Sequence, residues 1–180
     1  MRIAVLFLIA VALCSAATVE FIGPSTQTND GVDYVGPYDL IVDGLHIQGV
    51  CLDYDIRVAS VWTANWVPLT SITQPERTAY LEAAWIDSQF PVTSTNEWVA
   101  MHHGIWDLFG ASYSDGAAWD TLAAKNYGLI NPVSFMLLDA VPEGSSQDFL
   151  VQTPEPANWV MAVLGLMVLG VGSIKRKWYV

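Results

Sequence analysis

The stretch YVGPYDLIVDGLHIQGVCLDY, residues 34–54, decides the fold of this chain. Apolar residues, several of them β-branched, fill both halves, and the dipeptide Asp43-Gly44 separates them. Aspartate followed by glycine favours a two-residue turn with positive φ angles, the type that joins antiparallel strands. The pattern therefore predicts strands over residues 34–42 and 45–54, paired as a hairpin.

Further strand and helix signals follow the hairpin along the chain. Residues 58–69 are rich in β-branched and aromatic side chains and predict a third strand, residues 133–140 a returning strand, and residues 149–152 a weaker one. Proline, capping-box and glycine signals predict helices over residues 76–89, 97–109 and 116–127. This order predicts an α+β fold, with an antiparallel β-sandwich or sheet core and an inserted helical section packed at one end.

The chain divides into one folded domain and its flanking segments. Residues 18–31 are rich in glycine, serine, threonine and asparagine, which favours a flexible lead-in. The ectodomain is predicted over residues 32–141, and residues 142–156 are predicted to be a linker. A chain of this size suits one domain with a modest core.

The amino terminus has the pattern of a secretory signal peptide. Arg2 precedes an unbroken apolar run over residues 3–14, and Ser15, Ala16 and Ala17 supply the small residues of a leader-peptidase site. The apolar run is too short to span a membrane as a helix. We therefore expect residues 1–17 to form a signal helix, with export by the Sec pathway and cleavage after Ala17.

The carboxyl terminus predicts a membrane anchor. Residues 157–174 carry no charged side chain, which is long enough for one transmembrane helix, and Lys175, Arg176 and Lys177 follow directly. Because basic residues mark the cytoplasmic end, residues 175–180 are predicted to be a cytoplasmic tail. The domain is then expected to face away from the cytoplasm.

The motif Pro154-Glu155-Pro156 lies immediately before this apolar segment. Motif, apolar helix and basic cluster in this order resemble the PEP-CTERM sorting signal of Gram-negative surface proteins. The resemblance implies cleavage near the motif by an exosortase, a membrane protease, after a transient stay in the inner membrane with the domain in the periplasm. The released protein would then reach the cell surface or the extracellular polymer matrix. The two prolines keep this stretch extended and accessible outside the bilayer.

The domain between the two ends is strongly acidic. All 18 acidic residues fall between positions 18 and 155 beside three basic ones, which gives this part a formal net charge of −15 and leaves Arg57, Arg77 and Lys125 as its cations. Such a charge excludes nucleic acid as a partner and favours solubility outside the cell. Calcium binding at Asp53 and Asp55 is a weaker alternative, since calcium loops need more oxygen ligands. No cofactor is expected.

Tryptophan is abundant in the domain, at positions 62, 66, 85, 98, 106 and 119. Large aromatic rings fill small cores, and they also form stacking platforms for sugars. We assign at least four of these rings to the core. Trp62 and Trp66 share one face of a strand by the period of two, and they are the candidates for exposed sugar-stacking rings.

Cys51 is the one cysteine of the predicted mature domain, so no intramolecular disulfide can form. A strand ending in Cys51, then WTA at 62–64, YLEAAW at 80–85 and GIWDLF at 104–109, resembles the thioester-domain family of bacterial surface adhesins, over roughly residues 33–140. In that family a cysteine at this strand end and a glutamine four residues before the Ile-Trp tryptophan form a thioester that captures host amines. Cys51 matches the cysteine, but His102 occupies the glutamine position, and an imidazole has no carboxamide carbon for this bond.

The resemblance implies that Cys51 and His102 approach each other without a bond, with the sulfur and an imidazole nitrogen within about 4 to 5 Å. On the predicted helix His102 points inward with Trp98 and Ile105, whereas His103 points aside. Three interpretations stay open. We favour a core histidine beside an inert thiol; the others are a reactive thiol whose pKa His102 lowers, and a zinc site completed by His103 and an aspartate.

No other catalytic pattern emerges from the sequence. We therefore expect a protein that is not an enzyme and has an adhesive or structural role on the cell surface or in a biofilm matrix. Its expected partners are the sorting protease, the inner membrane and extracellular polysaccharide. The alternatives are a carbohydrate-binding module of the exopolysaccharide matrix and a thiol-reactive protein that uses Cys51.

Overall fold

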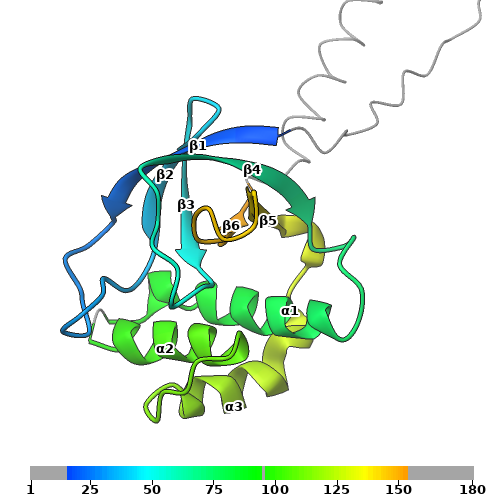
Figure 1. Cartoon of the computed structure of the whole chain (residues 1–180). Coiled ribbons are helices and arrows are strands. Elements are labelled where there is room, and N and C mark those ends of the chain that lie inside the picture. Colours follow the sequence, from blue (N-terminus) through cyan, green and yellow to red (C-terminus); the bar gives the residue numbers. More distant parts are fainter. Residues whose placement is uncertain (1–15, 95, 154–180) are drawn as a thin grey trace, which may run out of the picture.

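The computed structural model describes residues 16–94 and 96–153 (Figure 1). Residues 1–15 of the predicted signal peptide, the Pro154-Glu155-Pro156 motif, the predicted membrane helix at 157–174 and the basic tail lie outside the described residues. Among the residues that are described, no helix has the length and apolar character needed to cross a membrane.

The β-strands close into a barrel. Their bounds are β1 Ala16–Pro24, β2 Tyr38–Val42, β3 Leu45–Cys51, β4 Val61–Pro68, β5 Phe135–Val141 and β6 Phe149–Gln152. Neighbours pair in the order β1-β2-β3-β6-β5-β4, β4 returns to β1, and every pair is antiparallel. The predicted α+β class and antiparallel core are confirmed. The sandwich or open sheet was wrong in detail, because β1 bonds to both β2 and β4 and leaves no free edge.

The hairpin forms at the predicted dipeptide. Val42 pairs with Leu45, and the two residues between them have positive φ, 49° at Asp43 and 83° at Gly44. Both strands are shorter than predicted. At the start, Gly36 has a φ of 99°, which a strand residue does not adopt, so the segment before Tyr38 turns away from the sheet.

Two predicted flanking segments belong to the barrel instead. The flexible lead-in at 18–31 was wrong for its first part, because β1 pairs along its length with β2 and β4. The linker predicted at 142–156 is interrupted by a strand, because the weaker strand predicted at 149–152 is confirmed as β6, which lies between β3 and β5. The folded domain therefore extends beyond residues 32–141 on both sides. In β1 the side chains of Ala17 and Val19 are buried. This alternation of buried and exposed residues is too short to predict a strand from the sequence.

The helical section is inserted between β4 and β5 as predicted. It comprises α1 Glu76–Asp87, α2 Trp98–Leu108 and α3 Ala117–Asn126, with short 3-10 turns at Phe90–Val92, Tyr127–Leu129 and Pro132–Ser134. Figure 1 shows the three helices together at one end of the barrel. The predicted capping box is not observed, because α2 has Glu97 at its N-cap without a side-chain capping bond.

Two apolar clusters fill the domain. One lies inside the barrel, with Leu40, Trp62, Leu138 and Phe149 among its buried members. The other joins the barrel end to the helices, and its buried members include the following residues from barrel and helices: Val50, Leu52, Leu150, Ile86, Met101, Ile105 and Ala123. Burial of this apolar surface holds the helical layer on the barrel. Cys51 and α2 meet where the two clusters adjoin.

Candidate functional site

Cys51 and His102 lie side by side in the interior. Cys51 is the last residue of β3 and pairs with Phe149 of the neighbouring strand β6, and its side chain is fully buried. His102 is on the barrel side of α2 and is also fully buried. The Cys51 sulfur and His102 Nε2 are 3.1 Å apart. The predicted approach of the two side chains is confirmed.

The hydrogen bonds of His102 fix which nitrogen carries its proton. The Gly36 backbone N–H donates to Nδ1 at 2.8 Å, so Nδ1 has a lone pair and no proton. The proton of the neutral ring is then on Nε2, where it is shared between the Cys51 sulfur and the Cys51 carbonyl oxygen, 3.2 Å away. Burial lowers the pKa of His102 to about 3, so the ring is neutral at physiological pH. His102 donates to the cysteine and cannot take its proton.

Gly36 supplies this bond at a position where no other residue fits. Its φ of 99° is in the region that favours glycine, and an added Cβ would lie 2.6 Å from a ring carbon of Trp98. The segment that precedes β2 can therefore approach α2 closely. This approach brings the Gly36 N–H to His102.

The surroundings of the thiol disfavour its reactive, ionised form. Burial raises the pKa of Cys51 to about 12, and the side chains of Tyr38 and Trp106 oppose this rise only in part. Only the thiolate is a strong nucleophile. With its pKa raised to about 12, almost none of the Cys51 thiol is ionised at neutral pH. Of the three interpretations, the geometry favours the core histidine beside an inert thiol.

His103 forms a second polar cluster that the sequence did not reveal. Its Nδ1 is 2.8 Å from Asp115 Oδ1, its Nε2 is 3.1 Å from Asp30 Oδ2, and its ring stacks on Tyr113 with centroids 3.8 Å apart. His103 does point aside from His102, as predicted, and it is buried. A doubly protonated ring would donate to both carboxylates.

This cluster fixes the segment around Asp30. Asp30 Oδ1 accepts from the backbone N–H groups of Val32 and Asp33, both at 2.8 Å, while Oδ2 faces His103. Burial would raise the pKa of Asp30, but these two N–H groups and His103 outweigh burial and lower it. The segment around Asp30, which was predicted to be flexible, is thus bound to α2 through His103. The two residues are 73 positions apart, so no local sequence pattern predicts this contact.

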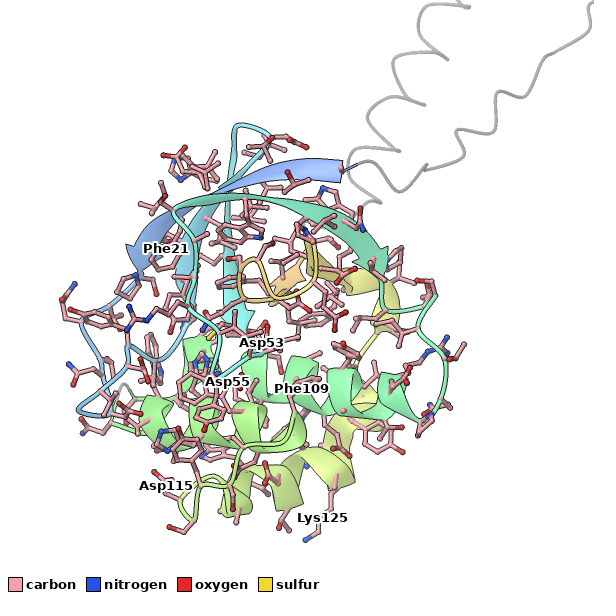
Figure 2. All side chains as sticks on the ribbon, in the orientation of Figure 1. Phe21, Asp53, Asp55, Phe109, Asp115 and Lys125 are labelled. Carbon is pink, nitrogen blue, oxygen red and sulfur yellow. The ribbon has the colours of Figure 1, made fainter. Side chains whose placement is uncertain are left out.

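A groove opens to solvent above the Cys51–His102 pair. Its volume is about 620 Å³, and Figure 2 labels Phe21 and Asp55 of its lining. Its lining comes from β1, the 32–34 segment, the start of β2, the β3–β4 loop, α2 and the β5–β6 loop. The residues are Phe21, Pro24, Val32, Asp33, Tyr34, Tyr38, Tyr54, Asp55, Ile56, Arg57, Val58, Trp106 and Gln147.

Tyr38 and Trp106 separate the groove from the buried pair. Both line the groove, and both also contact His102, with ring centroids 6.0 Å and 4.5 Å from the imidazole. The Tyr38 hydroxyl donates to the Tyr34 carbonyl, which fixes its ring. A ligand in the groove would therefore touch aromatic rings and not the sulfur.

The cations of the domain differ in their surroundings. Arg57 is exposed in the groove and forms no ion pair with any described residue. Arg77 donates to the carbonyl oxygens of Ile72 and Thr70, both at 2.6 Å, and Lys125 is exposed in the last turn of α3. Arg57 is thus available to a ligand, whereas Arg77 serves the local backbone.

The predicted sugar-stacking residues are not placed for that role. Trp62 is 6% exposed inside the barrel, with its ring centroid 5.7 Å from that of Phe149, and Trp66 is half-buried against the same core. The two do share one face, as the period of two predicted, but closure of the barrel turns that face inward. Among the residues that the structure describes, the exposed aromatic rings are Tyr34 and Tyr54 of the groove, which the sequence did not single out.

The loops beneath the groove are held by two aspartates. Asp53 Oδ2 accepts from the Asp148 backbone N–H at 2.7 Å, and Asp148 Oδ1 accepts from the Ala140 N–H at 2.8 Å. Burial raises the pKa of both, that of Asp148 to about 6, although these N–H groups oppose the rise. Asp53 is therefore engaged in loop structure. Within residues 16–94 and 96–153, no group of three or more His, Cys, Asp or Glu side chains is arranged to hold a metal ion.

Comparisons of the chain with protein-family models, with curated proteins and with solved structures returned no match. Its function is therefore argued from the site and from the two ends of the sequence.

Proposed function

We propose that this chain is an exported protein of the cell surface or extracellular matrix, with an adhesive or structural role and no catalytic activity. It is exported by Sec, held for a time in the inner membrane by residues 157–174, and cleaved by an exosortase near Pro154-Glu155-Pro156. The ectodomain is a relative of the thioester-domain adhesins that has lost the thioester. The 3.1 Å contact between Cys51 and His102, the two positions of that bond, supports this relationship.

The observation that carries the non-catalytic role is the direction of the Cys51–His102 hydrogen bond. An activated cysteine needs a base that accepts its proton. Here the Gly36 N–H occupies Nδ1, and Nε2 carries the proton toward the sulfur. Both side chains are fully buried beneath Tyr38 and Trp106, which speaks against the thiol-reactive alternative.

Ala16 and Ala17, predicted to end the signal helix, lie instead at the start of β1, where they pair with β4 and Ala17 is buried, so cleavage after Ala17 would shorten this strand by two residues. The Thr18 backbone N–H donates to Asp43 Oδ1 at 2.9 Å, and the Asp43 N–H donates to the Thr18 carbonyl at 3.0 Å. Cleavage after Ala17 would convert the Thr18 nitrogen into an ammonium group next to this carboxylate. An ion pair would then replace the present hydrogen bond, and residues 18–24 would remain in β1.

The sorting proposal is tested by substitution of the two prolines. In a Pro154→Ala, Pro156→Ala variant, the stretch before the membrane segment can become helical, and the processing site is lost. We expect the variant to accumulate in the membrane fraction as the uncleaved form. Release of the variant at the normal rate would contradict the proposal.

A second candidate, a carbohydrate-binding module of the exopolysaccharide matrix, is favoured by the groove. Ligand sites are concave, largely apolar and carry a few polar groups, and a volume of about 620 Å³ is in their usual range. The two candidates are compatible, because a matrix adhesin needs a polymer to hold.

A further inference from the structure

We propose that the groove binds a neutral polysaccharide, with a pyranose ring stacked on Tyr54 and its hydroxyl groups bonded to Asp33, Asp55 and Arg57. The inference deepens the adhesive role proposed above and rests on it. The site differs from the tryptophan face that the sequence suggested, since it is made by the 32–34 segment and the β3–β4 loop.

The stacking platform is exposed and held in place. Tyr54 is 50% exposed, and its ring contacts Trp106 and Tyr113 at centroid distances of 6.5 Å and 6.0 Å, the latter edge to face. Tyr34, 46% exposed, also lines the groove, on the segment fixed by Asp30 and His103. Rings that are already positioned lose little entropy when a ligand binds. The apolar face of a pyranose ring suits such a surface.

The polar groups of the groove require both donors and acceptors from the ligand. Ionised Asp33 and Asp55 only accept hydrogen bonds, whereas the Arg57 guanidinium only donates them. Each sugar hydroxyl does both, so one pyranose ring can serve all three side chains. A proline-rich peptide, the other frequent ligand of aromatic grooves, offers mainly carbonyl acceptors and would leave Asp33 and Asp55 opposite acceptors.

Charge selects a neutral ligand over an anionic one. The groove contains two carboxylates and lies in a part of the chain with a formal charge of −15, from 18 acidic and three basic residues, so a polyanion is repelled. Arg57 offsets part of the negative charge of Asp33 and Asp55 within the groove. Because Arg57 has no ionic partner among the described residues, its guanidinium is free to bond to a pair of neighbouring hydroxyl groups.

The experiment is affinity electrophoresis of the full chain in non-ionic detergent. Native gels contain a neutral polymer (hydroxyethylcellulose, glucomannan or dextran), an acidic polymer (polygalacturonate) or none. We expect at least one neutral polymer to retard the protein and polygalacturonate to leave it unretarded. Tyr54→Ala and Arg57→Ala should each weaken the retarding interaction about tenfold, because stacking and charge-assisted bonds are lost.

The controls separate the groove from general effects. Lys125→Ala removes a cation far from the groove and should retain the full interaction, and Tyr54→Phe should retain most of it because the ring remains. No retardation by any neutral polymer, retardation by polygalacturonate alone, displacement by a decaproline peptide, or full binding by Tyr54→Ala and Arg57→Ala would each overturn the inference. Since none of these gels measures cleavage at residues 154–156, failure here is distinct from failure of the sorting proposal.

Discussion

Replacement of His102 by asparagine isolates the energetic effect of the buried imidazole. The Oδ1 atom of asparagine can accept from the Gly36 N–H in place of Nδ1, but the new side chain does not titrate. In the wild-type protein, the pKa of His102 falls from 6.5 to about 3 on folding because burial disfavours the charged ring. A depressed pKa gives stability that is present above pH 6.5 and is lost as the pH falls toward 3.

The size of this effect follows from the two pKa values. Each pH unit below 6.5 costs the folded wild type about 1.4 kcal/mol until the folded pKa is reached. Between pH 7 and pH 4, the wild type should therefore lose about 3 kcal/mol more than His102→Asn does. Other titrating groups affect both proteins alike and cancel in the difference.

Urea unfolding of both proteins, followed by tryptophan fluorescence at several pH values, measures this difference. His46→Gln is the matched control, because it removes an imidazole that is exposed on β3 rather than buried. A wild-type minus His102→Asn difference that changes by less than about 1 kcal/mol between pH 7 and pH 4 would refute the buried, neutral ring.

Three further predictions concern the same region. At neutral pH a small thiol reagent should label Cys51 far more slowly in the folded protein than in the urea-unfolded protein, since burial raises the pKa of the thiol to about 12. Rapid labelling of the folded protein that His102→Ala abolishes without unfolding would instead support the hypothesis of a reactive thiol. Asp148→Asn keeps an acceptor for the Ala140 N–H and should raise the free energy of unfolding by about 1 kcal/mol at pH 8 but not at pH 4. The reason is that the pKa of Asp148 is raised to about 6 in the folded protein, so its ionised form becomes unfavourable only as the pH rises through about 6. An equal effect at both pH values would contradict this assignment. Gly36→Ala should destabilise the fold by several kcal/mol in urea unfolding, because the added Cβ would lie 2.6 Å from a ring carbon of Trp98 and the backbone φ at this position is 99°. Gly128→Ala is the control and should have a small effect, because the space around Gly128 is open.

The local parts of the fold were predictable because their signals are local. Asp43-Gly44 adopts positive φ angles, and a turn with that geometry needs no distant residue to be recognised. Closure of the barrel was not predictable, because it depends on β1 pairing with β4, where Val19 meets Trp62. That long-range pairing also explains the error over Trp62 and Trp66, since the shared face was right and only its direction was unknown.

The site divides in the same way. The approach of Cys51 and His102 was expected from a family pattern, and no spacing rule would have given it for residues 51 positions apart. The contact of His103 with Asp30 spans 73 positions and had no such pattern behind it. The groove was missed because its lining comes from segments that are far apart in the sequence. These are β1, the 32–34 segment, the start of β2, the β3–β4 loop, α2 and the β5–β6 loop.

The intact mass of the protein recovered from the cell envelope tests the central claim most directly. We expect one species that begins at Thr18, ends near Pro156 and carries an unmodified Cys51, because both end signals are processed and the thiol is inert. A chain that retains residues 157–180, or a covalent adduct on Cys51 in the folded protein, would contradict it.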